Sequence, residues 1–360
     1  MLAWPGFAPL AAALLVGVAA TADSFAADWV MRATVGGQPV EGRPIAWSES
    51  TVRLLARDGR LHQFDPRRAK DAKKTAPRFR PMSDSELRAE LYREFRGRFD
   101  FTSTGHYLVV HPPGEGAEWA GRFEEIYRAL LSYVRVRGFR TREPEFPLVA
   151  VVLRNQAEYR RFVSKSGTQV LPGALGHYDH YTNRVVLYDV TGGQGDWTAT
   201  AKTIVHEATH QVAFNVGVHT RAADTPYWVP EGLAMLFEPR AVWRPSGGDQ
   251  RGDRLNRERL EDFRHFSREG QPPFDLAAFV ASDQPFRRRG AAAYAQAWTL
   301  AFYLAETRPR DYSRYLAAIA GRPPLARYSP PARVRDFHAA FGDDFAILQA
   351  NWMRWVAELR

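Results

Sequence analysis

The sequence predicts an α+β protein in which a small β-module precedes a mixed sheet and a helical C-terminal lobe. Residues 28–66 contain short β-type runs separated by Gly-Gly, Glu-Gly and Asp-Gly pairs, the pattern of a compact antiparallel module. Residues 83–195 alternate strand and helix patterns, and the chain beyond Gly193 is mostly helical in pattern. With 360 residues and 45% apolar side chains, the chain can bury one large core or two modest ones.

The composition excludes several kinds of chemistry. The chain has no cysteine, so disulfides, thiol nucleophiles and thiolate metal sites are excluded, and histidine and carboxylate remain as metal ligands. The net charge of +9 comes mostly from arginines scattered along the chain, without a basic helix or an aromatic and basic module. We therefore expect a solvated basic surface and no nucleic-acid partner.

The N-terminus has the pattern of a secretory signal. An apolar run from Leu10 to Ala20 is followed by the small-x-small pattern Ala20-Thr21-Ala22, so residues 1–22 are predicted to be a signal peptide. No Lys or Arg precedes the apolar run, which leaves an uncleaved N-terminal anchor as the alternative. In either case we expect an exported protein of the periplasm or cell envelope.

The β-module is predicted to be a small barrel similar to an SH3-like barrel. In "RLLARDGRLHQF", the pair Asp58-Gly59 is predicted to form a two-residue hairpin turn. The module holds no cluster of acid, base and nucleophile, so we expect it to bind or pack, with a cell-envelope ligand as its candidate partner. Residues 67–82 are basic, contain prolines and lack apolar periodicity, which predicts a linker.

The second domain is predicted to span residues 83–360. Ser83 and Glu86 have the spacing of a capping box at the start of a short helix. "HYLVVH" and "FPLVAVVLR" predict strands, "EWAGRFEEIYRALLSYVRV" an amphipathic helix, and Asn155 the N-cap of another helix. "LGHYDHYTNRVVLYDV" predicts two strands joined at a turn that Asn183 tolerates. The expected divisions are a sheet subdomain to about 195, metal helices at 198–238 and a helical lobe at 255–360.

Residues 203–214, "TIVHEATHQVAF", carry the candidate chemistry. On a helix of 3.6 residues per turn, His206 and His210 lie one turn apart on one face, so both imidazoles can reach one ion at about 2.0–2.1 Å. Glu207 lies beside them, where its carboxylate can serve as a base without displacing a water at the metal. The alternative is an exposed helix with two solvated histidines and a surface glutamate.

A third ligand is predicted in "PYWVPEGLAMLFEP". Glu231 begins a second predicted helix after Pro230, and its carboxylate can complete a His-His-Glu triad that leaves a fourth position open for water. A catalytic zinc site needs this open position. Taken alone, Glu231 is equally an acidic residue favoured at a helix N-terminus. Beside the H-E-x-x-H helix, we interpret it as a zinc ligand.

"HEATH" followed by "YWVPEGLA" resembles the gluzincin group of zinc metallopeptidases, in which a W-x-x-E-G-x-A segment donates the third ligand. More narrowly, "GHYDHYTNRVVLYD" ahead of the metal helix resembles an uncharacterised exported bacterial family known as domain of unknown function 1570. The resemblance implies a zincin-like fold, Zn²⁺ held by His206, His210 and Glu231, and Glu207 as general base. It also implies that a substrate peptide adds as an extra strand along a sheet edge formed by Arg184, Val185, Val186, Leu187 and Tyr188.

Met235 departs from the resemblance. Many gluzincins place an acidic residue four positions after the glutamate ligand, where it orients a zinc histidine, and this chain has Met235 there. The partner of the zinc histidines is therefore unassigned. For the donor that stabilises a tetrahedral oxyanion, Tyr294 is the first candidate by analogy with the family, and Tyr227 and His219 are others. For each of these residues the alternative is a packing aromatic or a surface histidine.

Other conspicuous residues are predicted to have structural rather than catalytic roles. His177 and His180 flank Asp179, and we expect turn and cleft-edge residues there rather than a second metal site. The aromatic residues between Trp298 and Tyr303 fit a helix core. The sequence as a whole predicts zinc-dependent peptide-bond hydrolysis. The alternative is a catalytically degenerate envelope binding protein that retains the fold, which Met235 favours and the intact glutamate of the H-E-x-x-H motif disfavours.

Overall fold

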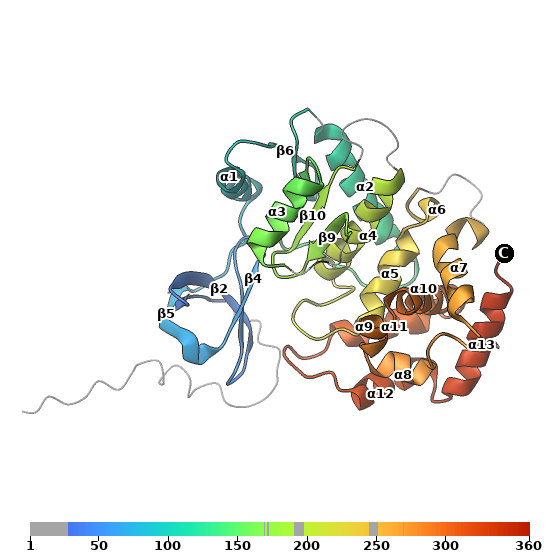
Figure 1. The fold of residues 1–360 in the computed structure, drawn as a ribbon. Coiled ribbons are helices and arrows are strands. Elements are labelled where there is room, and N and C mark those ends of the chain that lie inside the picture. Colours follow the sequence, from blue (N-terminus) through green and yellow to red (C-terminus); the bar gives the residue numbers. More distant parts are fainter. Residues whose placement is uncertain are drawn as a thin grey trace, which may run out of the picture.

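The fold consists of two sheets and a helical lobe (Figure 1). The computed structural model describes residues 28–114, 116–168, 170, 173–190, 198–244, 251–268 and 270–360. The predicted signal segment, residues 1–22, lies outside the described residues. Within the described residues, no helix has the length and apolar character needed to cross a membrane.

The N-terminal module is a five-stranded antiparallel sheet in the order β4-β3-β2-β1-β5. Its strands are β1 (Val30–Val35), β2 (Gln38–Trp47), β3 (Val52–Leu55), β4 (Leu61–Phe64) and β5 (Ala69–Ala76). Apolar side chains form small clusters on both faces, and Phe146 of the second domain joins one of them. The module is therefore packed against the rest of the protein.

Strand β5 shows that the predicted linker at 67–82 is wrong. β5 pairs with β1 along its length, with Ala69 opposite Val35 and Ala76 opposite Val30. Its side chains are mostly exposed, so the strand has no apolar periodicity to reveal it. Backbone pairing holds it instead, and its lysines suit an exposed sheet edge.

The hairpin between β3 and β4 also differs in detail from its prediction. The amide of Gly59 donates to the carbonyl of Ala56, which makes Arg57 and Asp58 the central residues of the turn. Gly59 follows with φ of 85°, as in the longer hairpin loop that ends in a left-handed residue. An Asp-Gly pair suits both loop types, because each needs a residue with positive φ.

The second sheet is mixed, in the order β6-β7-β8-β10-β9. β7, β8 and β10 are parallel neighbours, and the outer strands β6 and β9 are antiparallel to theirs. Helices α1 and α3 cover one face, and α2 and α4 cover the other. The predicted caps Ser83 and Asn155 are confirmed. The elements are α1 (Asp84–Phe95), β6 (Asp100–Ser103), β7 (Tyr107–His111), α2 (Gly116–Val136), β8 (Leu148–Leu153), α3 (Gln156–Ser166), β9 (Gly176–Asp179), β10 (Arg184–Tyr188) and α4 (Thr198–Asn215).

The order of this sheet corrects the predicted substrate edge. β10 pairs with β8 on one side and with β9 on the other, so it has no free edge, and all of its residues are buried. The hairpin folds β9 back along the outside of β10, with Asn183 at φ of 60° in the turn. The outer strand is therefore β9, and the prediction for Arg184, Val185, Val186, Leu187 and Tyr188 is wrong.

The C-terminal lobe is helical, as predicted. Its helices are α5 (Trp228–Phe237), α6 (Arg240–Trp243), α7 (Arg257–Phe266), α8 (Leu276–Ala281), α9 (Gln284–Arg288), α10 (Gly290–Thr307), α11 (Pro309–Ala320), α12 (Pro330–Phe341) and α13 (Phe345–Ala357). The aromatic residues of α10 from Trp298 to Tyr303 are buried, which confirms their interpretation as core. Gly232 lets α5 approach α10, because a Cβ there would lie 2.8 Å from the Cβ of Ala301 and 2.9 Å from the carbonyl oxygen of Ala297.

Candidate metal centre

Helix α4 is fixed on the mixed sheet so that its H-E-x-x-H residues line a cleft. The buried side-chain amide of Gln211 donates to the carbonyls of Val149 and Asn183 at 2.9 and 2.8 Å. Val212 and Ala213 pack into the core beside it. The polar and apolar anchors together set which face of α4 is left for the cleft.

Three side chains converge on one point of this cleft. The Nε2 atoms of His206 and His210 are 3.2 Å apart. The carboxylate of Glu231 lies 3.4 Å from the first of these nitrogens and 3.6 Å from the second. Ligand atoms at about 2.0–2.2 Å from a tetrahedral ion lie about 3.3–3.6 Å from one another. The His206, His210 and Glu231 group can therefore hold a metal ion.

The start of α5 places Glu231 opposite the histidines. The amide of Tyr227 donates to Oδ1 of Asp283 at 2.9 Å, which ties the N-terminus of the helix to the lobe. Asp283 is held in turn by Arg333 through two hydrogen bonds of 2.8 Å. The position of the third ligand thus depends on contacts from distant parts of the chain.

Glu238 is a candidate site residue that the sequence analysis missed. Its Oε1 lies 2.9 Å from Nδ1 of His206, and its Oε2 accepts a hydrogen bond of 2.6 Å from Asn256. Burial opposes ionisation of Glu238, but the hydrogen bond and charge of His206 outweigh it and lower the pKa of the carboxyl. Glu238 follows Glu231 by seven residues, about two helical turns, and so lies on the same side of the helix.

Met235 is consequently not a defect of the site. Its side chain is fully buried in the hydrophobic core. Glu238 takes the place of the expected acidic residue, since a metal-bound histidine is commonly oriented by a carboxylate at its other nitrogen. The glutamate at i+7 in "EGLAMLFE" was the available signal.

Glu207 lies between the ligands and the edge strand. Its Oε2 accepts a hydrogen bond of 2.7 Å from the backbone amide of Tyr178 in β9. Burial raises the pKa of the Glu207 carboxyl, and the charge of His206 opposes this rise. The carboxylate is thus oriented, largely desolvated and adjacent to a strand edge.

Two tyrosines border the metal ligands, and His219 does not. The hydroxyls of Tyr227 and Tyr294 are 3.1 Å apart, and the Tyr227 hydroxyl helps to lower the pKa of the Glu231 carboxyl, although burial opposes this. Both tyrosines line the cleft. His219 is buried against Phe214 away from the cleft lining, and burial lowers its pKa to about 3.

The β9–β10 turn has the predicted character. Nδ1 of His177 bonds to the hydroxyl of Tyr159 at 2.8 Å, and Asp179 accepts hydrogen bonds from Tyr181 and Thr182 within the turn. His177 and His180 line the cleft. The described residues of this turn form no second metal group.

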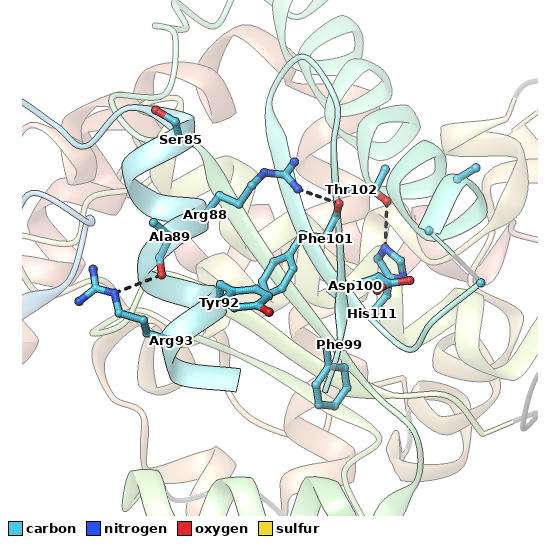
Figure 2. Close-up of a pocket in the computed structure, with 13 residues that line it drawn as sticks. Ser85, Arg88, Ala89, Tyr92, Arg93, Phe99, Asp100, Phe101, Thr102 and His111 are labelled. Atoms are coloured by element: carbon cyan, nitrogen blue, oxygen red, sulfur yellow. Dashed lines mark hydrogen bonds between the residues drawn. The ribbon is translucent and has the colours of Figure 1, made fainter. Parts of the chain in front are cut away.

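A further cavity lies away from this chemistry. The cleft at the metal ligands has a volume of about 850 Å³. The other, of about 930 Å³, lies between α1 and β6, with Tyr92 and Phe101 among its lining residues (Figure 2). Two of its polar side chains bond to neighbours: Arg88 donates to the carbonyl of Phe101, and His111 bonds to Thr102. The described residues that line it form no group of metal ligands comparable to that at α4.

The fold and site define an α+β protein with a His-His-Glu group that can hold a metal ion. The model of a family described as "Protein of unknown function (DUF1570)" matches residues 200–326. This range contains the three metal-ligand candidates together with Glu207 and Glu238. The family resemblance noted in the sequence is confirmed over this range. The comparison with curated proteins gives no match.

Proposed function

We propose that the protein is a zinc-dependent peptidase with a zincin-like catalytic domain. One observation carries the proposal: the Glu207 carboxylate lies between the three-residue metal group and β9, and it is held by the amide of Tyr178. Such a site has an ion position, a base and an adjacent strand edge. These are the components that metal-assisted hydrolysis of an extended peptide needs.

The donor set fits zinc. Two imidazole nitrogens and one carboxylate are the ligands of many catalytic zinc sites, and a fourth position stays open for water or substrate. When bound there, zinc supplies Lewis acidity, which acidifies a water molecule and polarises a carbonyl group. Glu238 would keep His206 in the tautomer that presents Nε2 to the ion.

The residues of the chain have separable roles in this scheme. Glu207 accepts a proton from the attacking water and returns it to the leaving amine. Tyr294, with Tyr227 beside it, is placed to donate a hydrogen bond to the oxyanion that develops on the substrate carbonyl. In an antiparallel strand, the amide and the carbonyl of one residue point to the same side. The Tyr178 carbonyl therefore faces the same side as its amide and can accept a hydrogen bond from an added substrate strand.

The remaining parts of the proposal rest on the sequence and the sheet order. The N-terminal signal pattern places the activity in the periplasm or cell envelope. The five antiparallel strands of the module, with β1 between β2 and β5, support an SH3-like barrel. The alternative of a catalytically degenerate binding protein was supported mainly by Met235, which stands where an acidic residue is expected. Glu238 supplies such a carboxylate to His206, so this support is lost.

The test compares metal content and peptide cleavage in matched variants. Wild-type protein is expected to contain about one zinc per chain, and the combined change His206→Ala and His210→Ala is expected to abolish this content. Glu207→Gln retains an oxygen that can accept from Tyr178, so it should fold and bind zinc while lowering cleavage of a broad peptide library by about 10²–10⁴-fold.

Three outcomes would contradict the proposal. Absence of stoichiometric zinc from the wild type, or zinc that survives both histidine changes, would remove the metal site. Equal cleavage by wild type and Glu207→Gln would assign the activity to a contaminant. Zinc binding without cleavage by the wild type would favour the binding protein.

A further inference from the structure

The N-terminal module contacts the catalytic part at one end of the cleft. The amide of Leu61, at the start of β4, donates to the carbonyl of Tyr181 at 2.7 Å. Arg53 of β3 donates to the carbonyl of Ala222 at 2.8 Å, and Arg221 donates back to the carbonyl of Gly59 at 2.9 Å. The module thus forms part of the cleft wall rather than a separate appendage.

Arg53 and Arg221 both line the cleft at this contact. Arg53 bonds to the side-chain oxygen of Gln63 and to the Ala222 carbonyl. Arg221 bonds to the carbonyls of His180, Tyr181 and Gly59. All of these acceptors are neutral, and within the described residues neither guanidinium has a carboxylate within salt-bridge distance.

The other cationic side chains that line the cleft differ in this respect. Arg259 pairs with Asp262, Arg333 pairs with Asp283, and Lys202 pairs with Glu258. Burial lowers the pKa of Arg221, and Tyr178, Asp179 and Asp58 offset only part of this effect. The two arginines at the module therefore carry positive charge without a direct carboxylate partner within 4 Å among the described residues, although Asp224 also lines the cleft.

Both guanidinium groups retain donors for a ligand. Nη1 of Arg221 and Nη2 of Arg53 have no hydrogen-bond acceptor among the described residues. Each is an NH₂ group with two protons, and paired guanidinium donors match the two oxygens of a carboxylate. These two NH₂ groups are therefore suited to binding an anionic group of the substrate.

The position of the pair relative to the proposed chemistry is also defined. Arg221 holds the carbonyl of His180, two residues beyond Tyr178, whose amide holds Glu207. Two residues of extended chain span about 7 Å. A peptide lying along β9 with its reacting carbonyl near Glu207 would therefore place a group one or two residues away near the arginines.

We propose that Arg53 and Arg221 form a carboxylate-binding subsite of the cleft, so that the β-module selects substrates. This inference rests on the proposed peptidase function. The carboxylate belongs either to the C-terminus of a peptide or to an acidic side chain close to the cleaved bond. The module thereby acquires a role in specificity, and Arg53 is its specificity-determining residue.

The test measures peptide binding by the zinc-loaded Glu207→Gln protein, so that it does not depend on turnover. The probes are randomised hexapeptides with Glu or Gln fixed at each position in turn, made with a free C-terminal carboxylate or with an amide. We expect one carboxylate to strengthen binding by about 10–100-fold, and Arg53→Gln to remove this preference. Preference for the free acid identifies the chain end, and preference for Glu identifies a side chain.

Arg32→Gln serves as the matched control, because Arg32 lies in the same module, is exposed and pairs with Glu41 outside the cleft. It should leave the preference unchanged. If Arg53→Gln unfolds at a lower temperature than this control, Arg53→Lys keeps the charge but loses the paired donors, and it should show an intermediate preference.

Different results would contradict the carboxylate subsite and the peptidase function. Equal binding of acidic and neutral probes, binding of neither, or a preference that survives Arg53→Gln would overturn the subsite. Cleavage by the wild type is measured in parallel. An Arg53-dependent preference without any wild-type cleavage would leave the subsite standing and overturn the peptidase alone.

Discussion

Oε1 of Glu238 lies 2.9 Å from Nδ1 of His206, on the other side of the ring from Nε2, the nitrogen that can hold a metal ion. This contact joins the end of α5 to the middle of α4, and Asn256 at the start of α7 bonds to the same carboxylate. Three helices thereby determine the orientation of one candidate ligand. The contact also supplies an acceptor for the ring N–H, which a metal-bound imidazole needs.

Glu238→Ala is expected to weaken zinc binding by about 10–100-fold, because His206 loses the partner that fixes its tautomer and orientation. Competition with a chromophoric chelator measures this affinity. Lys202 lies 3.4 Å from Glu238 and also pairs with Glu258. Glu258→Ala is therefore the control, since Glu258 is exposed and shares this lysine without touching a candidate ligand. Equal affinity of the two variants would show that Glu238 has no part in metal binding.

Gly232→Val is expected to destabilise the protein by about 1–3 kcal/mol through overpacking. Its side chain would meet Ala301 and the carbonyl of Ala297, push α5 away from α10 and displace the neighbouring Glu231. Zinc affinity should fall together with stability in thermal unfolding and chelator competition. Gly121→Ala on α2 meets no atom within 4 Å and is expected to raise stability by about 0.5–1 kcal/mol. An unchanged zinc affinity in the Gly232 variant would contradict the role assigned to this close packing.

The elements that the sequence predicts well are those specified by local pattern. β8 is apolar throughout because both faces are covered, and α2 shows a complete apolar stripe. The capping box at Ser83 and the turn at Asn183 are likewise properties of a few neighbouring residues. The spacing of His206 and His210 belongs to the same class, since a single helix brings the two rings together.

The features that the sequence does not reveal depend on pairing between distant segments. β5 is held by backbone pairing with β1, and its side chains are mostly exposed. The segment 69–76 therefore lacks the alternation of apolar and polar residues that would predict a strand. The edge position of β9 depends on β10 pairing with β8, which is a property of the sheet and not of either strand. Glu238 contacts His206 only because α4, α5 and α7 pack together. The arginine pair likewise requires the module to dock on the loop after α4.

Tyr294→Phe and Tyr227→Phe are expected to separate catalysis from metal binding. Tyr294→Phe should lower kcat by about 10²–10³-fold with unchanged zinc affinity, because it removes a hydroxyl placed to serve the oxyanion. Tyr227→Phe should also weaken zinc binding, because the Tyr227 hydroxyl helps to keep the carboxyl of the candidate ligand Glu231 ionised. Steady-state kinetics and chelator competition on both variants measure the two effects. Loss of kcat only in the Tyr227 variant would reassign the oxyanion role to that residue.

Asn183 is expected to be the position at which a change in the hairpin turn has the largest effect. It is 3% exposed, and its side chain exchanges hydrogen bonds of 2.9 and 2.8 Å with Asn215 and accepts one of 2.9 Å from the Tyr178 hydroxyl. Asn183→Ala leaves these groups unpaired, which lowers the free energy of unfolding by about 1–3 kcal/mol, and alanine at φ of 60° adds further strain.

Asn183→Gly distinguishes the two contributions, because glycine adopts the positive φ but makes none of the side-chain hydrogen bonds. Denaturant unfolding should place Asn183→Gly between the wild type and Asn183→Ala. Activity should fall in both variants, since the loss frees Tyr178, whose amide orients Glu207. Asp71→Gly is the control: Asp71 also has positive φ, at 54°, but it is exposed on β5, so the change should be neutral or stabilising. If Asn183→Gly matched the wild type in stability and activity, the turn would act through its backbone alone and the amide network would have no part in holding β9 against α4.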